Sequence, residues 1–354
     1  MNFTNSKEIQ MAKVLLIGDT HNGANGNNMR LLRQNVELYK NFIFPLIEYN
    51  KIDFVIDLGD FFDDREKIDI RVLKTVREEM LNDLPVPWYF VVGNHNTYFK
   101  NNNTLNNLQE TIGDLEGVNI VDSFKQVDNI DIYPWILAKN VETYKQILEK
   151  TEGRFAVGHF EFAGFPFDKS RVAEVKEKLT PSDFAKYEKV FSGHYHIASE
   201  KGNIVYVGSP VQLTWIDVDV EKRVAILDTK TGEVEYVVNT NNLYHQYTVG
   251  EDGDISHIPL DEIPESRVKI KYSTNTPKDV INNIQSILKN LNPDQLIFVP
   301  TGAKKKTDKV EVKIESGIQQ SIIDYLNVYP FEESKVHKTV EKILLSYLNK
   351  TNKE

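Results

Sequence analysis

The stretch Val14-Leu15-Leu16-Ile17-Gly18-Asp19-Thr20-His21 joins a short apolar run to a polar loop that begins with glycine. Such a run is typical of a buried central strand, and loops at the carboxyl ends of these strands often carry functional residues. The combination recurs where residues 54–58 lead into Gly59-Asp60 and where residues 88–92 lead into Gly93-Asn94-His95. Apolar residues at helical spacing separate the three units. The pattern predicts βαβ crossovers and a layered α/β core.

The later half of the chain is richer in strand patterns. The strand candidates are residues 118–121, 130–135, 155–157, 204–207, 224–227 and 234–238. The turn sequence Thr229-Lys230-Thr231-Gly232 predicts that the last two form a hairpin. We therefore expect a mixed sheet or two packed sheets rather than one parallel sheet.

Composition limits the classes of function. The 354 residues are 40% hydrophobic and 27% charged, enough for a sizeable core and for more than one domain. The absence of cysteine excludes disulfides, thiolate metal ligands and a cysteine nucleophile. No run reaches the roughly 18 apolar residues of a membrane span, and we expect a cytoplasmic protein of a bacterium or a phage-infected cell. The net charge of −10 argues against a uniform basic coat for nucleic acid, although local basic patches still allow DNA binding.

Changes in pattern predict five segments. Residues 1–10 form a polar leader, either dispensable or an artefact of start-site choice, because Met11 directly precedes the first strand. Residues 11–240 form the main domain. Residues 245–301 form a small β-α-β domain whose helix is expected to begin with Thr276 as N-cap and Pro277 in the first turn.

The remaining two segments are a linker, residues 302–316, and a helical region, residues 317–350. The linker contains Lys304, Lys305 and Lys306, for which a solvated loop is at least as well favoured as contact with phosphate. Apolar stripes mark two amphipathic helices and include Ile322, Leu326, Val340 and Leu344. Two such helices bury their stripes poorly against each other, so docking on a partner is slightly favoured over folding back on the same chain.

Oxygen and nitrogen donors follow the predicted buried strands. They are Asp19, His21, Asp60, Asn94, His95, His159, His194 and His196. A carboxylate that bridges two cations, with neutral imidazoles and an amide in the other positions, suits a two-metal site. Asp60 is the expected bridge. Strand alternation would put His194 and His196 on one face, but two histidines that serve neighbouring cations require a loop just past the strand.

The motifs Asp19-x-His21-x-Gly23, Gly59-Asp60-x-x-Asp63, Gly93-Asn94-His95, Gly158-His159 and Gly193-His194-x-His196 resemble those of the calcineurin-like metallophosphoesterases. Gly208-Ser209-Pro210, the small domain and the terminal helices are similar to the SbcD-type nuclease subunits. This group includes the meiotic recombination eleven nucleases and the recombination endonuclease subunits of T-even phages. The resemblance implies a four-layer α/β/β/α core, a β-α-β capping domain that contacts DNA and a C-terminal helix pair.

The resemblance also implies roles for the site residues. One metal would be held by Asp19, His21, Asp60 and His196, and the other by Asp60, Asn94, His159 and His194. His95 would be a catalytic residue that stabilises the phosphate and protonates the leaving oxygen. Two Mn²⁺ ions are expected, with Mg²⁺ as the alternative.

The implied partners are DNA ends and an SbcC-type ABC ATPase with a long coiled coil, which the terminal helices would grip. The family also implies a nuclease homodimer within a heterotetramer. The helical stripes at residues 31–47 and 72–80 would suit that dimer, but packing against the sheet explains them equally well.

Asn96 departs from the family pattern, which usually has Asp after the histidine. In the family that Asp hydrogen-bonds the ring of His95, so Asn96 is expected to weaken acid catalysis and leave metal binding intact.

Three functions remain open at this point. The leading one is a manganese-dependent nuclease, with 3'-5' exonuclease and endonuclease activity on duplex and single-stranded DNA, within a recombination and repair complex. The alternatives are a phosphoesterase for nucleotides or other small phosphoesters, and a DNA-end-binding subunit whose catalysis is weakened by Asn96.

Overall fold

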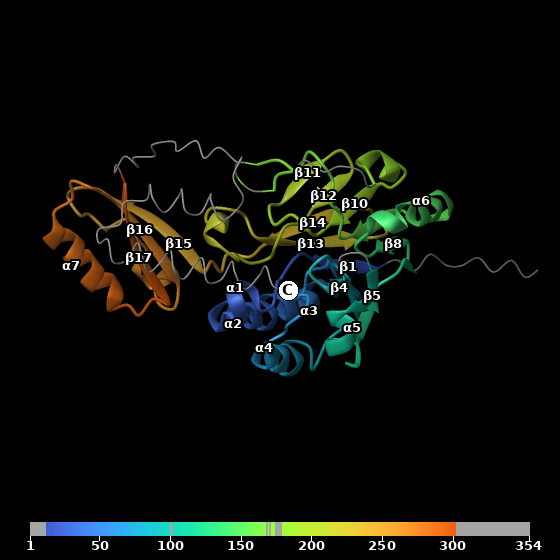
Figure 1. Cartoon of the computed structure of the whole chain (residues 1–354), viewed down its shortest axis with the longest axis horizontal. Helices are drawn as coiled ribbons and strands as arrows, with labels where there is room; N and C mark the ends of the chain where they lie inside the picture. The colour runs from blue at the N-terminus through green and yellow to red at the C-terminus, as the bar shows by residue number, and fades with distance from the viewer. Residues whose placement is uncertain (1–11, 100–101, 168, 170, 174–178, 302–354) are drawn as a thin grey trace, which may run out of the picture. The chain divides into compact units, whose positions relative to one another are not determined.

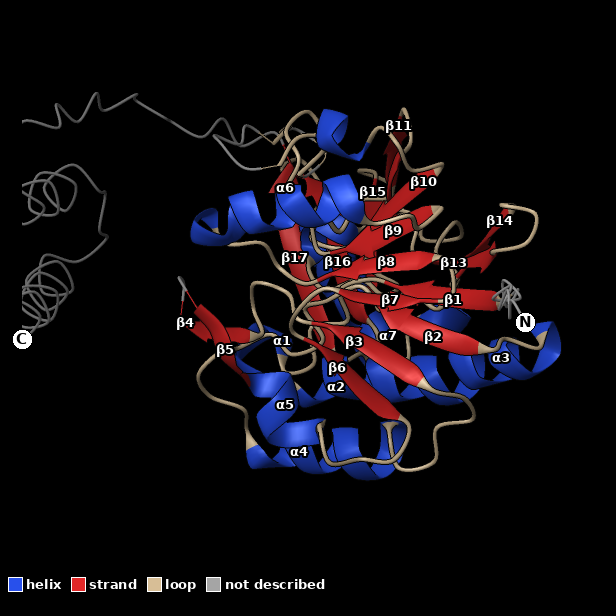
Figure 2. Cartoon of the chain, turned by 90° about the vertical axis from the view of Figure 1, so that its right-hand side faces the viewer, coloured by secondary structure: helices blue, strands red, loops and turns tan. Residues whose placement is uncertain are grey.

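The computed structural model of the protein describes residues 12–99, 102–167, 169, 171–173 and 179–301. Two six-stranded sheets pack face to face, and helices cover their outer faces (Figures 1 and 2). The prediction of a layered α/β/β/α core is therefore confirmed.

The first sheet has the strand order β14-β13-β1-β2-β3-β6. Its strands are β1 Lys13–Ile17, β2 Phe54–Asp57, β3 Trp88–Val91, β6 Val118–Val121, β13 Arg223–Asp228 and β14 Val234–Val238. β1, β2, β3 and β6 are parallel, so their carboxyl ends lie at one edge of the sheet. β13 runs antiparallel to β1, and β13 and β14 form the predicted hairpin.

The second sheet has the order β11-β12-β10-β9-β8-β7. Its strands are β7 Lys125–Val127, β8 Ile130–Tyr133, β9 Phe155–Gly158, β10 Lys189–Ser192, β11 Ser199–Lys201 and β12 Ile204–Tyr206. The four inner strands are parallel, and the edge strands β7 and β11 are antiparallel to their neighbours.

Burial on both faces explains why the central strands read as continuous apolar runs. In β1, Val14 and Leu16 lie in the core between the two sheets, whereas Leu15 and Ile17 lie in the core beneath the helices. A third core covers the outer face of the second sheet, where Tyr144 of α6 packs against Tyr133 of β8. Parallel sheets covered on both faces require this composition.

Helices cover the outer face of each sheet. They are α1 Ala24–Asn27, α2 Met29–Leu38, α3 Phe44–Asn50, α4 Ile70–Thr75 and α5 Asn107–Ile112 on the first sheet, and α6 Val141–Lys150 on the second. α2 continues into α3 through a π-helical turn, Tyr39–Ile43, which Pro45 favours because it cannot donate the backbone hydrogen bond of a regular helix. The apolar stripes of α2 to α4 are buried in the core beneath the first sheet, so packing within the chain accounts for them.

A smaller three-stranded sheet follows the two-sheet core. It contains β15 Tyr244–Val249, β16 Arg267–Ser273 and β17 Gln295–Thr301, with α7 Lys278–Lys289 between the last two strands. It has a core of its own around Ile270 and Leu288. β15, parallel to β16, was not predicted, because its sequence Tyr-His-Gln-Tyr-Thr-Val has little apolar alternation. Residues 245–301 as a separate domain remain a prediction.

The predicted cap of α7 is wrong. Pro277 occupies the N-cap position, and the buried hydroxyl of Thr276 has no hydrogen-bond partner among the described residues. Pro277 itself has φ −58° and ψ 143°, so the helix begins only after it and the hydroxyl of Thr276 makes no cap hydrogen bond.

Several predictions fall outside the described residues. They concern the leader, the linker with Lys304, Lys305 and Lys306, and the helix pair with Ile322, Leu326, Val340 and Leu344. Within the described part of the chain, no helix combines the length and the apolar character needed to cross a membrane.

Candidate metal centre

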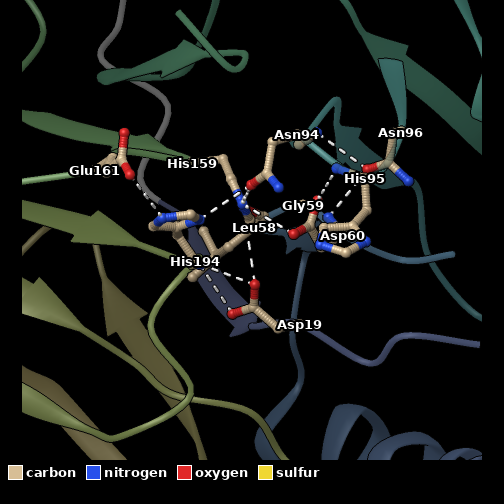
Figure 3. A network of polar contacts seen from close by, with 12 residues as sticks. Asp19, Leu58, Gly59, Asp60, Asn94, His95, Asn96, His159, Glu161 and His194 are labelled. Atoms are coloured by element: carbon tan, nitrogen blue, oxygen red, sulfur yellow. Dashed lines mark hydrogen bonds and ion pairs between the residues drawn. The ribbon is translucent and has the colours of Figure 1, made fainter. Parts of the chain in front are cut away.

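All seven residues predicted to bind metal lie at one end of the two sheets, in loops after five parallel strands; Figure 3 shows part of this group. Asp19 and His21 follow β1, Asp60 follows β2, Asn94 follows β3, His159 follows β9, and His194 and His196 follow β10. The carboxyl ends of parallel strands meet at the same edge. The sheet topology alone therefore gathers residues that are far apart in the sequence.

Three of these residues have a backbone conformation that side chains rarely adopt. The φ angles are 45° at His21, 55° at Asp60 and 87° at His194. A left-handed conformation costs a non-glycine residue roughly 1–2 kcal/mol. Strain of this kind concentrates at functional sites, where the surrounding structure holds it. His194 lies beyond the end of β10, in agreement with the prediction that residues 193–196 form a loop.

The first donor group consists of Asp19, His21 and His196, whose ligand atoms all lie within 4.8 Å of one another. Nε2 of His21 lies 3.1 Å from Nε2 of His196 and 3.9 Å from Oδ2 of Asp60. The amide of His194 donates to both carboxylate oxygens of Asp19, at 2.8 and 3.1 Å, which fixes that carboxylate.

The second donor group consists of Asp60, His159 and His194. Nε2 of His159 lies 3.2 Å from Oδ2 of Asp60. Oδ1 of Asn94 lies 3.0 Å from both Nε2 of His159 and Nδ1 of His194. The same carboxylate oxygen of Asp60 thus faces a histidine of each group.

The chemistry of the donors fits two divalent cations. Every donor is a carboxylate, an imidazole or an amide oxygen, the set that suits Mn²⁺, Mg²⁺, Fe²⁺ or Zn²⁺. The facing Nε2 atoms of His21 and His196 would repel each other as two lone pairs, so the pair needs a shared proton or a cation. We propose that the two groups hold one metal each and share Asp60.

Charge in the two groups is balanced internally. Burial raises the pKa of Asp19. Burial would also raise the pKa of Asp60. The positive charge of His159, the hydrogen bond that His159 donates and the charge of His21 outweigh burial, so the pKa of Asp60 lies far below its usual value. Burial favours the neutral ring of His159, but the charge of Asp60 and its hydrogen bond prevail and raise the pKa of His159 to about 9. In the metal-free protein, the proton on His159 balances the charge of Asp60, as a bound cation would.

The pKa of His196 shifts in the opposite direction from those of the two buried histidines, His21 and His159. Burial and the neighbouring His21 hold the pKa of His196 well below its usual value. Burial also opposes protonation of His21, but the hydrogen bond that the ring donates to Asp63 and the charge of Asp60 outweigh it and raise the pKa of His21. A neutral His196 is the form that can bind a metal.

Asp63 is the last residue of the motif Gly59-Asp60-x-x-Asp63, and no role for it was predicted. Its Oδ1 lies 3.0 Å from Nδ1 of His21, and its carbonyl oxygen accepts a hydrogen bond from Nδ1 of His95. Asp63 thus orients two histidines at once and leaves Nε2 of each ring directed elsewhere. Carboxylates that bond the second nitrogen of a ligand histidine fix its orientation and its tautomer.

Two further residues near the second group were also missed. The ring of Trp135, which follows β8, lies 5.7 Å from the ring of His159 and 5.3 Å from that of His194. A carboxylate oxygen of Glu161 lies 3.8 Å from Nε2 of His194 (Figure 3). Trp135 is the last residue of the predicted strand 130–135, whereas β8 ends at Tyr133, and tryptophan is not a metal ligand, so the sequence carried no signal for its place at the site.

His95 lies close to Asp60 and His21, and its amide donates to Oδ1 of Asp60 at 2.8 Å. In the described part of the chain, no hydrogen bond joins the side chain of Asn96 to the ring of His95, contrary to the expectation from the family Asp. Its Oδ1 instead accepts hydrogen bonds from the amides of Asp60 and Gly93, both at 3.0 Å, and its Nδ2 donates to Asn107. The buried side chain is directed into the turn and away from the histidine, so it supports the backbone of Asp60.

The donor groups open into a cavity of about 390 Å³. His21, Asp60, Asn94, His95, His194 and His196 line its floor, and Phe167, Leu213 and Ile216 form an apolar side. Phe167 and Ile216 are about half exposed. A phosphate group with an attached apolar moiety could therefore reach the donor groups from solvent.

Comparisons with known proteins agree with this geometry. The chain matches the calcineurin-like phosphoesterase family over residues 12–198, which is more than half of its length. Exonuclease subunit 1 of Enterobacteria phage T4 is 26% identical over 328 residues, covering 90% of this chain and 93% of the relative.

A second relative, the putative phosphoesterase 078R of invertebrate iridescent virus 3, is 28% identical over 247 residues, covering 66% of this chain and 67% of its own. A solved archaeal phosphodiesterase aligns with 64% of this chain at 14% identity and a TM-score of 0.32. The chain belongs to the calcineurin-like phosphoesterase family and is a metal-dependent phosphodiesterase.

Proposed function

We propose that the chain is the nuclease subunit of an SbcCD-type recombination and repair complex, and that it hydrolyses DNA phosphodiester bonds with two Mn²⁺ ions. The observation that carries the proposal is the extent of similarity to the T4 exonuclease subunit, which covers 90% of this chain and so continues well beyond the phosphoesterase core. A phosphatase for small substrates has little need of the small sheet that follows the core.

The two donor groups that share Asp60 support a dinuclear mechanism. When bound, the two cations would neutralise charge on the phosphate and activate water. The protein's own residues would bind the cations and transfer the proton. His95, oriented by the carbonyl of Asp63, would face the phosphate and give a proton to the leaving ribose oxygen. Asn94 would complete the ligands of the second metal, because its Oδ1 lies 3.0 Å from both Nε2 of His159 and Nδ1 of His194.

The proposal includes partners. DNA ends would be the substrate, and an SbcC-type ABC ATPase would bind through the terminal helix pair, with two nuclease chains in a heterotetramer acting in the cytoplasm. Because contacts to the DNA backbone dominate in such a nuclease, its affinity for DNA should fall steeply with salt and depend little on sequence.

The test is cleavage of linear duplex DNA by the purified chain with Mn²⁺, alone and with an ATPase partner. We expect shortening from the 3' end, and loss of cleavage in Asp60→Asn, which removes the shared carboxylate. Rapid hydrolysis of bis-p-nitrophenyl phosphate without any cleavage of DNA would instead assign the chain to small phosphoesters, as the similarity to a putative viral phosphoesterase allows. Failure to cleave DNA with both metals bound and the partner present would refute the proposal.

A further inference from the structure

We infer that Lys222 is a positioning residue for the metal centre: together with Asp217, its buried ammonium group holds the loop that presents His196 to Asp19 and His21. This inference rests on the proposed two-metal function. It concerns residues of the 209–222 segment, which are not members of the donor groups.

The ammonium group of Lys222 is buried and fully used. Lys222 is 2% exposed. Its Nζ donates to Oδ1 of Asp217 at 2.6 Å, to Oγ of Ser209 at 2.8 Å and to the carbonyl oxygen of His196 at 3.3 Å. An ammonium group has three donors, and each has an acceptor here. Lysine is almost never this buried without such partners.

Asp217 is held just as firmly on its other side. Its Oδ2 accepts hydrogen bonds from the amides of Leu213 and Thr214, at 3.0 and 2.8 Å, and from the hydroxyl of Thr214 at 3.2 Å. The carboxylate therefore closes the turn at residues 213–217 while it binds Lys222. Neither charge can shift without opening this turn.

The carbonyl of His196 is the point where the network reaches the metal centre. It accepts a second hydrogen bond from the amide of Ser209, at 3.2 Å. The other buried ligand rings are fixed through their second nitrogen, as Nδ1 of His21 is by Asp63 and Nδ1 of His159 is by the carbonyl of Leu58, 2.8 Å away. Among the described residues, no hydrogen bond to Nδ1 of His196 is present, so its backbone anchor has to set the direction of the ring.

A buried ion pair is a poor means of adding stability, because the desolvation of both charges offsets their attraction. Its better-supported use is to specify one arrangement of the groups around it. Here the groups around it are the ligand loop on one side and the cavity-lining residues Thr214 and Asp217 on the other. The position of the pair is therefore explained by the geometry it imposes on His196.

The network continues to the small sheet. Nε2 of Gln212 donates to the carbonyl of Asp217 at 3.4 Å, and Oε1 of Gln212 accepts the amide of Tyr244, the first residue of β15, at 2.7 Å. One chain of hydrogen bonds thus joins the His196 loop to the start of the small sheet.

The test compares metal binding in the full chain and in the double variant Lys222→Met/Asp217→Asn, which removes both charges and leaves no unpaired ion buried. Mn²⁺ titrations followed by electron paramagnetic resonance count bound ions and their affinities without any substrate. We expect the wild type to bind two ions. The double variant should bind the first with unchanged affinity and the second at least about tenfold more weakly, as expected when support of a ligand is lost. It should thus resemble His196→Ala.

Tyr187→Phe is the matched control. It removes a buried hydroxyl that bonds Asp131 at 2.8 Å and Tyr133 at 2.7 Å, away from the donor groups. It should lower the unfolding temperature and keep both ions at wild-type affinity. A folded double variant with both affinities unchanged would overturn the inference.

If the double variant does not fold, the same Mn²⁺ titration of Lys222→Arg tests the inference. Lys222→Arg keeps the charge, but a guanidinium cannot place one nitrogen among the same three oxygens. Weaker binding of the second ion would support the inference, and wild-type binding would overturn it. A wild-type chain that binds two ions but cleaves no DNA in the presence of the partner would refute the nuclease proposal alone. A wild-type chain that binds fewer than two ions would refute both.

Discussion

Nε2 of His21 and Nε2 of His196 lie 3.1 Å apart, although 175 positions separate the two residues in the chain. The first follows β1 of one sheet and the second follows β10 of the other, so the contact joins the two sheets at their carboxyl ends. The carboxylate of Asp19 lies with both rings, and Oδ2 of Asp60 lies 3.9 Å from Nε2 of His21. The expected behaviour of the two metals follows from this arrangement.

His196→Ala should remove the metal held with Asp19 and His21 and retain the metal at His159. The second donor group keeps all of its members in this variant. We expect one bound Mn²⁺ in place of two and a loss of activity of at least about 100-fold, because the dinuclear clamp is broken. Metal content after gel filtration measures the first effect. His257→Ala, at an exposed histidine, is the control and should keep two ions.

Asp63→Ala should weaken the same metal by a different route. Removal of the carboxylate frees Nδ1 of His21 and leaves every direct donor in place. The loss of such an orienting partner typically costs 10- to 100-fold in metal affinity. Asp63→Asn should cost less than Asp63→Ala, because an amide oxygen can still accept the hydrogen bond. Equal affinity in the wild type and in Asp63→Ala would show that His21 needs no support.

The strand ends were predictable from the sequence because each apolar run stops at a glycine followed by a polar residue. That pattern is enough to predict the positions of Asp19, Asp60 and Asn94. β15 was not predictable, since Tyr244 to Val249 lack alternation and are held mainly by pairing with β16.

The supporting contacts could not be read from the sequence either. The contact between Asp63 and His21 depends on how two loops approach each other, which neither loop encodes alone. The surroundings of Asn96 were mispredicted for the same reason. Its partners are amides of the turn around Gly93 and the side chain of Asn107, and local sequence gives no sign of them.

Asn96→Asp should not restore a stronger acid. The side chain at position 96 bonds backbone amides and not the ring of His95. Aspartate would replace the donor that faces Oδ1 of Asn107 with an acceptor, and a buried polar group without a partner costs about 1–3 kcal/mol. We expect a lower unfolding temperature and a cleavage rate within a fewfold of the wild type. A large gain in rate at unchanged stability would instead favour the reading that Asn96 weakens catalysis.

The metal-free protein should lose stability as the pH rises from about 6.5 to about 9. Burial disfavours the charged ring of His159, but Asp60 outweighs burial, and the folded-state pKa is raised from 6.5 to about 9. A raised pKa means that the folded chain binds the proton more tightly. The stabilisation is therefore complete below pH 6.5 and disappears as the pH passes through 9. One proton changes the free energy of unfolding by at most about 1.4 kcal/mol per pH unit.

Chemical unfolding in the presence of a chelator measures this slope. His159→Asn should flatten it, because the titrating group is gone. Saturating Mn²⁺ should reverse the trend, since metal binding requires the deprotonated ring and therefore strengthens as the pH rises. A slope that is unchanged in His159→Asn would assign the proton to another group.

Gly59→Ala adds one methyl group, and we expect it to disrupt metal binding at His159. A Cβ atom at this position would lie 2.5 Å from Nδ1 of His159 and 3.2 Å from the Cα atom of Gly93, and the backbone has a φ of 107°. The methyl group would displace the ring that bonds Asp60, so we expect loss of the His159 metal together with reduced stability. Gly202→Ala separates the two causes. Gly202 also has a positive φ, of 65°, but no atom lies within 4 Å of its Cβ position. Gly202→Ala should therefore show the effect of backbone strain alone and retain both metals. Equal metal loss in Gly59→Ala and Gly202→Ala would mean that crowding at His159 is not the cause.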